Sequence, residues 1–185
     1  MKSTVAGFLF VGGQSTRFGS NKLFHPVNDI PMGLVVLNNL SGCLGDSSLV
    51  GPAVDHPDFV NVSRVSGDRE GHGPLGAMCD VLEQATTDFV VFAPCDTPFF
   101  TASDFNRLVE GRADCDVVVA ADIQPPHLRH WLLSCWNVKA TRDHMIGAYS
   151  SGERSIHRAI TGLNVIEQQF SNHALTNVNT PSDAQ

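Results

Sequence analysis

The sequence lacks the features that mark a zinc, disulfide-bonded or secreted protein. Its five cysteines (positions 43, 79, 95, 115 and 135) are odd in number and contain no C-x-x-C pair. Its eight histidines are dispersed, and none forms an H-x-x-x-H pair on a plausible helix. This pattern argues against a zinc site and favours reduced thiols, as in a cytoplasmic protein, over a disulfide framework.

Positive charge and long apolar runs are also scarce. Lys and Arg total 12 against 19 Asp and Glu, and the net charge of −7 argues against a nucleic-acid-binding protein. It leaves room for a local basic pocket. The first apolar run stops at Gly12, which is too short for a membrane span, and no small-residue cleavage site follows it. We therefore expect no membrane contact and a cytoplasmic location.

The remaining composition is that of a soluble globular chain. Its 185 residues are 42% hydrophobic and 17% charged, and we expect one domain over residues 1–185. Short apolar runs, typical of strands, alternate along the chain with segments of helical periodicity. This alternation predicts an α/β fold with a mostly parallel sheet and helices on both faces. The expected strands are 5–11, 48–51, 59–65, 88–92, 116–121, 131–136 and 164–170. The expected helices are 31–40, 74–85, 104–110, 138–148 and 154–161, with another beginning at Pro181.

The loop after the first strand combines glycines with two cations. Gly12 and Gly13 end the strand, and Arg17 and Lys22 follow at fixed offsets. Glycines let backbone N–H groups approach an anion closely, so the stretch predicts a loop that holds nucleotide phosphates. It matches neither G-x-G-x-x-G nor G-x-x-x-x-G-K-[ST]. The alternative is a tight turn with solvated cations.

Two aspartates follow other predicted strands. Asp96 lies in a Pro-Cys-Asp-Thr-Pro frame, where two prolines fix the backbone and a carboxylate could hold Mg²⁺ on nucleotide phosphates. The alternative for Asp96 is a cap of its own turn. Asp68 lies in a glycine-rich loop, where a single aspartate is more often a turn residue than a ligand-binding residue. Because these residues follow strands, we expect them at one edge of the sheet, together with the N–H groups of Gly73-Pro74-Leu75.

A third group of residues surrounds the predicted strand 131–136. His130, Trp131 and Trp136 could line a pocket for an aromatic substrate, although tryptophans more often serve packing. Cys95 beside Asp96 suggests a nucleophile, but no base lies at a diagnostic position, and an inert thiol is favoured. No G-x-S-x-G elbow occurs, so covalent hydrolysis has no support.

Five blocks in the right order resemble the molybdenum cofactor guanylyltransferases, the MobA family. They are Gly12-Gly13-Gln14-Ser15-Thr16-Arg17-Phe18-Gly19-Ser20-Asn21-Lys22, Gly73-Pro74-Leu75-Gly76-Ala77-Met78, Pro94-Cys95-Asp96-Thr97-Pro98-Phe99, Gly152-Glu153-Arg154-Ser155 and Asn177-Val178-Asn179-Thr180-Pro181. The resemblance implies a Rossmann-like nucleotidyltransferase that joins GMP from GTP to the terminal phosphate of molybdopterin or its molybdenum form. Pyrophosphate leaves. It also implies Mg²⁺ as cofactor and transient contacts with other cofactor-biosynthesis proteins or target molybdoenzymes.

The resemblance also assigns roles to residues of this chain. It implies catalytic roles for Arg17, Lys22 and Asp96, with Asp96 as the metal ligand. The implied nucleotide contacts are Phe10, Val11, Gly12, Gly13, Lys22, Asp68, Gly73, Pro74, Leu75 and Asp96. The implied acceptor contacts are His130, Trp131, Asn177 and Asn179, and Asn179 could hold either the metal or the pterin phosphate.

The glycines bear on the choice of base. In this family Gly12-Gly13 and Gly73-Pro74-Leu75 favour guanine over cytosine. The chain departs from the family pattern at four places, namely Asn21, Gly51, Gly76-Ala77 and Trp131. Two alternatives remain, which are a related nucleotidyltransferase that uses CTP or a sugar phosphate, and a GTP-binding regulator without catalysis.

Overall fold

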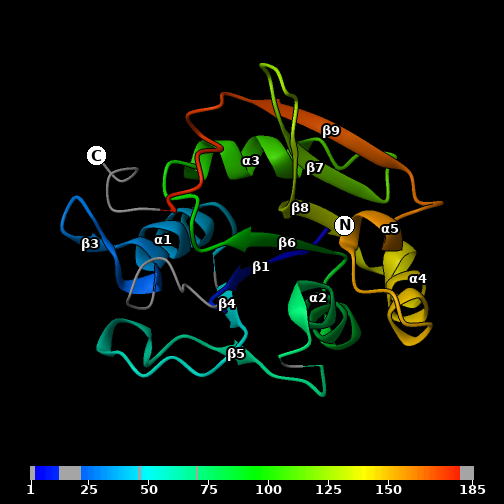
Figure 1. The fold of residues 1–185 in the computed structure, drawn as a ribbon, viewed down its shortest axis with the longest axis horizontal. Coiled ribbons are helices and arrows are strands. Elements are labelled where there is room, and N and C mark those ends of the chain that lie inside the picture. Colours follow the sequence, from blue (N-terminus) through cyan, green and yellow to red (C-terminus); the bar gives the residue numbers. More distant parts are fainter. Residues whose placement is uncertain (1–2, 13–21, 46, 70, 180–185) are drawn as a thin grey trace.

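A seven-stranded sheet in the order β5-β4-β1-β6-β8-β7-β9 forms the centre of the computed structural model, which describes residues 3–12, 22–45, 47–69 and 71–179 (Figure 1). Strands β5, β4, β1 and β6 run parallel, as do β7 and β9, whereas β8 runs antiparallel to both β6 and β7. The bounds are β1 Val5–Phe10, β4 Ser47–Val50, β5 Arg64–Val65, β6 Phe89–Pro94, β7 Val117–Asp122, β8 Arg129–Asn137 and β9 Val165–Phe170. A short hairpin pairs β2 (Pro26–Val27) with β3 (Ile30–Pro31).

The central strands are buried on both faces, as their continuous apolar runs predict. All six residues of β7 are buried, and Val90 to Ala93 of β6 have no exposed surface. Burial of both faces is what parallel strands with helices above and below require. The structure therefore confirms the α/β class and the mostly parallel sheet.

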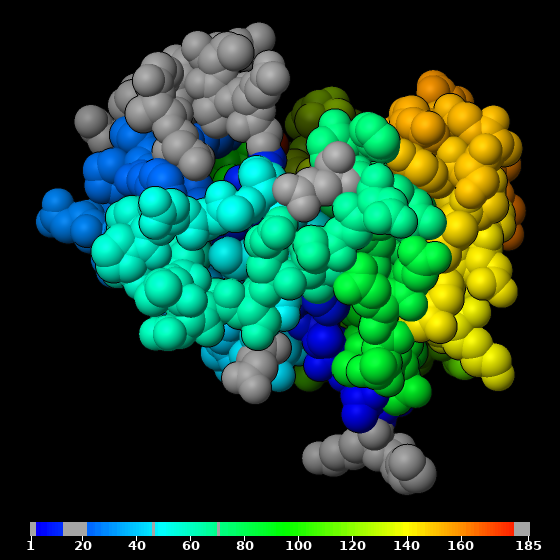
Figure 2. Space-filling view, turned by 90° about the horizontal axis from the view of Figure 1, so that it is seen from below, coloured from blue at the N-terminus to red at the C-terminus, as the bar shows by residue number. Residues whose placement is uncertain are grey.

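Helices cover both faces of the sheet. On one face α1 (Met32–Leu44) and α3 (Ala102–Glu110) pack in one apolar cluster. On the other, α2 (Gly73–Gln84), α4 (Val138–Ser150) and α5 (Ile156–Ala159) form a second cluster. Figure 2 looks onto this second face, where α2 and the residues before it lie beside α4. No helix among the described residues has the length and apolar character to cross a membrane.

Several predicted boundaries were wrong for local physical reasons. Only Arg64–Val65 of the expected strand 59–65 pairs with the sheet, and Pro57–Phe59 is a 3₁₀ helix (η2) because proline suits a first helical turn. Helix α1 continues to Leu44 rather than stopping at 40. Helix α3 begins at Ala102 because Thr101 and Asp104 form a capping box. The helix expected from Pro181 lies outside the described residues.

A buried ion pair fixes the loop that precedes α2. Asp80 is 3% exposed and accepts from the backbone N–H of Arg69 at 3.2 Å and from its Nη1 at 2.7 Å. The same Nη1 donates to Glu83 at 2.7 Å. A Cβ on Gly67 would lie 2.2 Å from the Asp80 Cγ, so the loop backbone approaches the carboxylate closely. The ion pair thereby ties residues 67–69 to the middle of α2.

Replacing Asp80 with alanine is expected to lower the free energy of unfolding by about 3 kcal/mol, because it leaves the partly buried Arg69 with the exposed Glu83 as its remaining carboxylate partner. Chemical denaturation followed by circular dichroism measures the change. Asp143→Ala, at an exposed position on α4, is the matched control and should shift the midpoint little. An Asp80→Ala midpoint equal to that of the control would contradict the role of the ion pair.

Candidate functional site

Three of the predicted site residues meet at the edge where the parallel strands end. The Lys22 Nζ donates to Asp96 Oδ2 at 2.7 Å and to Asn179 Oδ1 at 2.8 Å. Lys22 begins the 3₁₀ helix η1 (Lys22–Phe24), Asp96 follows β6, and Asn179 lies near the end of the described chain. The Lys22 and Asp96 side chains are 13% and 24% exposed, so a ligand can reach them. The fold thus joins residues that are far apart in sequence.

The backbone around Asp96 is held from two sides. The Val178 N–H donates to the Asp96 carbonyl at 2.9 Å, which lays the segment with Asn179 beside the end of β6 (Figure 1). Thr97 is fully buried, and its hydroxyl donates to the Pro94 carbonyl at 3.3 Å. The Asp96 carboxylate contacts Lys22, in contrast to the alternative in which it caps its own turn. The loop therefore presents a carboxylate aimed away from its own backbone.

Two oxygen donors at this point fit a magnesium ion. The Asp96 carboxylate and the Asn179 amide oxygen both lie against Lys22 Nζ. Mg²⁺ prefers oxygen ligands and keeps water and substrate phosphates in its shell, so one or two protein ligands suffice. The described residues contain no group of three or more His, Cys, Asp or Glu side chains that could hold a metal by themselves. The donor set is therefore suited to a metal that arrives with phosphates.

A largely apolar cavity of about 550 Å³ lies between the ends of β1 and β4 and the start of α2. Apolar walls with exposed backbone are what a nucleotide base needs for stacking and edge recognition. Four predicted nucleotide residues line the cavity, whereas Val11 and Leu75 are buried in the core. The lining residues are Phe10, Gly12, Val50, Gly51, Pro52, Gly71, Gly73, Pro74, Ala77 and Leu132.

Gly51, one of the four departures from the family pattern, also lines the cavity. Its φ of +121° and the position of an added Cβ, 3.2 Å from the Gly12 nitrogen, require glycine where β1 and β4 end side by side. The Arg64 Nη1 donates to the Gly51 carbonyl at 2.6 Å and fixes the peptide.

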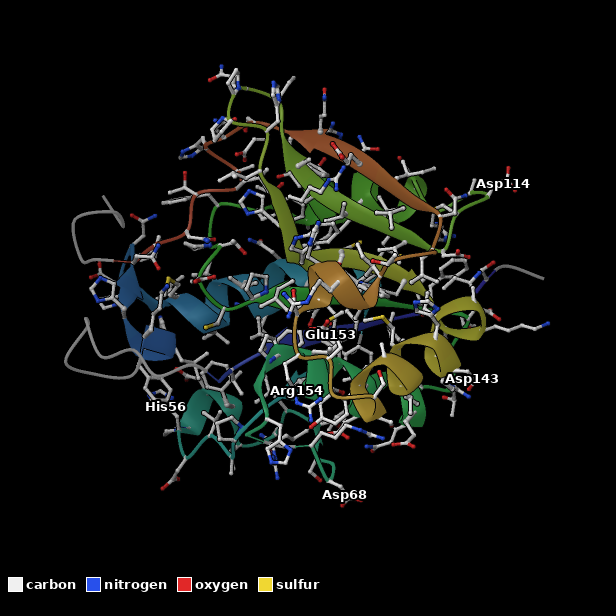
Figure 3. The ribbon with its side chains drawn as sticks, turned by 45° about the vertical axis from the view of Figure 1, so that its right-hand side comes forward. His56, Asp68, Asp114, Asp143, Glu153 and Arg154 are labelled. Atoms are coloured by element: carbon white, nitrogen blue, oxygen red, sulfur yellow. The ribbon has the colours of Figure 1, made fainter. Side chains whose placement is uncertain are left out.

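Of the other predicted nucleotide and phosphate residues, one lies away from the cavity and two lie outside the residues that the structure describes. Asp68 is exposed and extends away from the body of the protein in Figure 3, and it is not a lining residue. The nearby Gly71 lines the cavity instead. Gly13 and Arg17 lie outside the described residues.

The predicted acceptor residues lie along the same edge. The His130 Nε2 is 3.0 Å from Asp122 Oδ1, and its side chain is 16% exposed. Trp131 is partly buried, with its ring centroid 5.7 Å from that of His157. Asn177 is exposed, and its carbonyl accepts from Asn179 Nδ2 at 3.4 Å. The structure thus places His130 and Trp131 on β8, and the two asparagines beside β6.

Two residues that invited a functional reading serve packing. Trp136 is fully buried, and its Nε1 donates to Ser134 Oγ at 2.7 Å within the core. Burial, followed by the neighbouring Asp96 charge, raises the pKa of the Cys95 thiol to about 12. A thiol that stays protonated at neutral pH is a poor nucleophile. The structure therefore supports the interpretation of Cys95 as inert.

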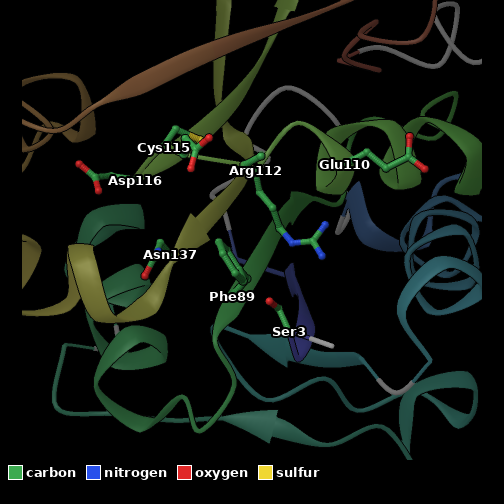
Figure 4. Close-up of a pocket in the computed structure, with 9 residues that line it drawn as sticks. Ser3, Phe89, Glu110, Arg112, Cys115, Asp116 and Asn137 are labelled. Atoms are coloured by element: carbon green, nitrogen blue, oxygen red, sulfur yellow. The ribbon is translucent and has the colours of Figure 1, made fainter. Parts of the chain in front are cut away.

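A second hollow of about 610 Å³ lies at the opposite edge of the sheet, where β1, β6 and β7 begin (Figure 4). Its walls include Ser3, Phe89, Arg112 and Asp116, and none of the predicted site residues. Ligands of open α/β sheets bind at the carboxyl ends of parallel strands. The cavity beside Lys22 and Asp96 is therefore the better candidate, although it is slightly smaller.

Comparison with known proteins agrees with this geometry. A family model for the MobA-like NTP transferase domain matches residues 7–165. A molybdenum cofactor guanylyltransferase from Yersinia pseudotuberculosis is 26% identical over an alignment of length 199, which covers 99% of this chain and 94% of that protein. A relative of the same name from Yersinia pestis is 27% identical with the same coverage.

Two solved structures show the same fold. Molybdopterin-guanine dinucleotide biosynthesis protein A from Archaeoglobus fulgidus superimposes with a TM-score of 0.76 at 21% identity, covering 97% of this chain and 94% of that one. The 2-C-methyl-D-erythritol 4-phosphate cytidylyltransferase from Thermus thermophilus gives a TM-score of 0.74 at 13% identity, covering 96% and 94%. The fold is therefore shared by enzymes named for guanine and for cytosine nucleotides.

Proposed function

The chain belongs to the MobA-like NTP transferase family, and we propose that it transfers GMP from GTP to the terminal phosphate of molybdopterin or Mo-molybdopterin. The names of its relatives, which cover almost the whole chain, support this activity. The observation that carries the proposal is the meeting of Lys22, Asp96 and Asn179 at the edge of the sheet that also carries the apolar cavity, where Phe10 pairs with Pro94. We propose that residues 1–185 act as one nucleotidyltransferase domain, which the single continuous sheet supports.

The proposed chemistry is a direct displacement at the α-phosphorus of GTP. An oxygen of the acceptor phosphate forms the new bond to phosphorus, and the bond to the β-phosphate oxygen breaks with release of pyrophosphate. The acceptor oxygen is already anionic, so the chain needs no strong general base. The protein instead aligns the two phosphates and neutralises their charge. Bound Mg²⁺, held by Asp96 with Asn179, would supply further charge neutralisation.

The nucleotide residues divide between base and phosphates. Phe10, Gly12, Gly73 and Pro74 line the cavity and would contact the guanosine part, with Val11 and Leu75 fixing the backbone beneath it. Lys22 would bind phosphates, and Gly13 and Arg17 join it in the proposal as members of the same loop. The contact of Asp68 with the nucleoside is proposed from the family resemblance alone, since Gly71 and not Asp68 lines the cavity.

We assign the acceptor to the β8 side of Asp96. The strand order runs from the cavity at β4 and β1, through Asp96 after β6, to β8 with His130 and Trp131. A molecule that enters from the β8 side can approach the α-phosphate opposite the leaving pyrophosphate. Asn177 and Asn179 would close this side from the C-terminal segment.

The proposed reaction implies particular ligands, a location and protein contacts. We propose GTP and the molybdopterin as ligands, a cytoplasmic location supported by five free thiols, and no role in binding nucleic acid or membranes. Transient contacts with other cofactor-biosynthesis proteins or target molybdoenzymes would deliver the acceptor and receive the product.

Pyrophosphate release tests the proposed function. The purified chain is mixed with Mg²⁺, molybdopterin, and GTP or CTP in parallel, with EDTA as the metal-free control. We expect release with GTP only, dependent on both the acceptor and Mg²⁺. Release with CTP instead would overturn the assignment of guanine from Gly12-Gly13 and Gly73-Pro74-Leu75. Binding of GTP without release would favour the regulator.

A further inference from the structure

Asp122 is a buried carboxylate that the proposed chemistry leaves without a role. It ends β7 and is 7% exposed, whereas aspartates are seldom buried without a charged or hydrogen-bonded partner. Its Oδ1 lies 3.0 Å from His130 Nε2, and its Oδ2 accepts from the Leu128 N–H at 3.3 Å. The carboxylate thus has one oxygen on the loop backbone and the other on a histidine.

The histidine is fixed in one orientation by this contact. A carboxylate only accepts hydrogen bonds, so Nε2 of His130 carries a proton and donates it to Asp122. Nδ1 then remains as the ring nitrogen that a ligand can engage. Within the described part of the chain Nδ1 has no hydrogen-bond partner, and the side chain is 16% exposed. Carboxylates orient histidines in this way in sites where the other ring nitrogen binds a ligand.

The local strand geometry supports a site at this position. Val119 pairs with Ser134, but the next residue, Ala120, pairs with His130, so three residues of β8 bulge out of the ladder. Ser134 Oγ donates to the Trp131 carbonyl at 2.7 Å and holds the bulge closed. Bulges of this kind re-aim side chains and are common beside active sites.

The sheet order places His130 on the acceptor side of Asp96. Strand β8 is the neighbour of β6, and Phe92 pairs with Ser134. Because of the bulge, His130 lies only one ladder step beyond Ser134, beside Ala120, whereas Asp96 lies in the loop just after β6 ends. Both lie at the edge where β6 ends and β8 begins, which is also the edge of the cavity that Leu132 of β8 helps to line.

We propose that Asp122 is a positioning residue that holds His130 to bind the terminal phosphate of the acceptor. This inference rests on the proposed function, because it assigns one contact of the same transfer reaction. His130 donates from Nδ1 to an acceptor phosphate oxygen, and the Asp122 carboxylate compensates the positive charge that the ring gains when both nitrogens carry protons. In this proposal the guanosine part of GTP occupies the cavity at Phe10, Gly12 and Gly51, so its binding does not require this pair.

The test separates acceptor binding from nucleotide binding in steady-state kinetics with molybdopterin. Asp122→Asn keeps an oxygen for the Leu128 N–H but removes the charge, and it should raise the KM for the acceptor about tenfold while leaving the KM for GTP within about twofold. His130→Gln should do the same. The double variant should be no worse than the more affected single variant, since the two residues act as one unit.

The controls keep the outcomes distinct. Gln124→Ala changes an exposed residue of the same loop and should leave both KM values unaltered. An unchanged acceptor KM in His130→Gln, or an equal rise of both KM values, would overturn the inference, and His130→Gln decides the matter even if Asp122→Asn folds poorly. A wild-type chain that releases no pyrophosphate would instead contradict the proposed function itself.

Discussion

Replacing Asp96 with alanine is expected to reduce transfer by at least about a thousandfold, to the limit of detection. The structure gives the reason, since the Asp96 carboxylate is the acidic side chain that contacts Lys22 at the edge beside the cavity. Its removal takes away the principal oxygen ligand for Mg²⁺ and the partner that orients Lys22. Pyrophosphate release with GTP, acceptor and Mg²⁺ measures the loss in kcat.

Two further variants make this result interpretable. Asp96→Asn keeps the shape of the side chain but not its charge, and we expect a loss close to that of alanine, because Mg²⁺ favours a charged oxygen ligand. Asp143→Asn removes an exposed carboxylate from α4 and should leave the rate unaltered (Figure 3). Thermal melting of each variant separates loss of chemistry from loss of fold. A fully active, folded Asp96→Ala protein would contradict the metal assignment.

Two local signals placed Asp96 at the binding edge of the sheet, while its assignment to the metal rests on the family resemblance. A continuous apolar strand predicts burial on both faces, and the residues after such a strand reach the binding edge of a parallel sheet. The same rule placed Gly12 at the cavity that the structure shows, and the predicted helix start placed Gly73 there. The meeting of Lys22 with Asn179 followed from the family resemblance and not from either rule, since no local pattern links the two ends of the chain.

The sequence did not predict features that depend on the direction of a strand or on a contact with a residue far along the chain. The run 131–136 predicted a strand correctly, but an apolar run reads the same in both directions, so the antiparallel pairing of β8 was not foreseen. Asp122 reads as the first residue after a strand and offers no sign of its contact with His130 across the loop. Asp80 likewise looks like an exposed helical residue until Arg69 is placed beside it.

Replacing Lys22 with alanine is expected to weaken GTP binding and to lower turnover by about a hundredfold. Its Nζ lies between Asp96 and Asn179, and its side chain is only 13% exposed, so it acts at a site with less water than the open surface. The cation would bind phosphate oxygens when GTP is present and stabilise the charge that develops on the leaving pyrophosphate. The KM for GTP and kcat, measured at saturating acceptor, report the two effects.

A comparison of Lys22 and Asp96 variants distinguishes their roles. Lys22→Met keeps the length of the side chain without its charge and should behave like alanine, while Lys139→Met, exposed on α4, is the matched control. Removing Lys22 leaves the Asp96 carboxylate available to Mg²⁺, so the Mg²⁺ concentration for half-maximal rate should not rise. In Asp96→Asn it should rise steeply. If both variants raised the Mg²⁺ requirement equally, Lys22 would act by holding Asp96 in place for the metal, and its separate role on the phosphates would be wrong.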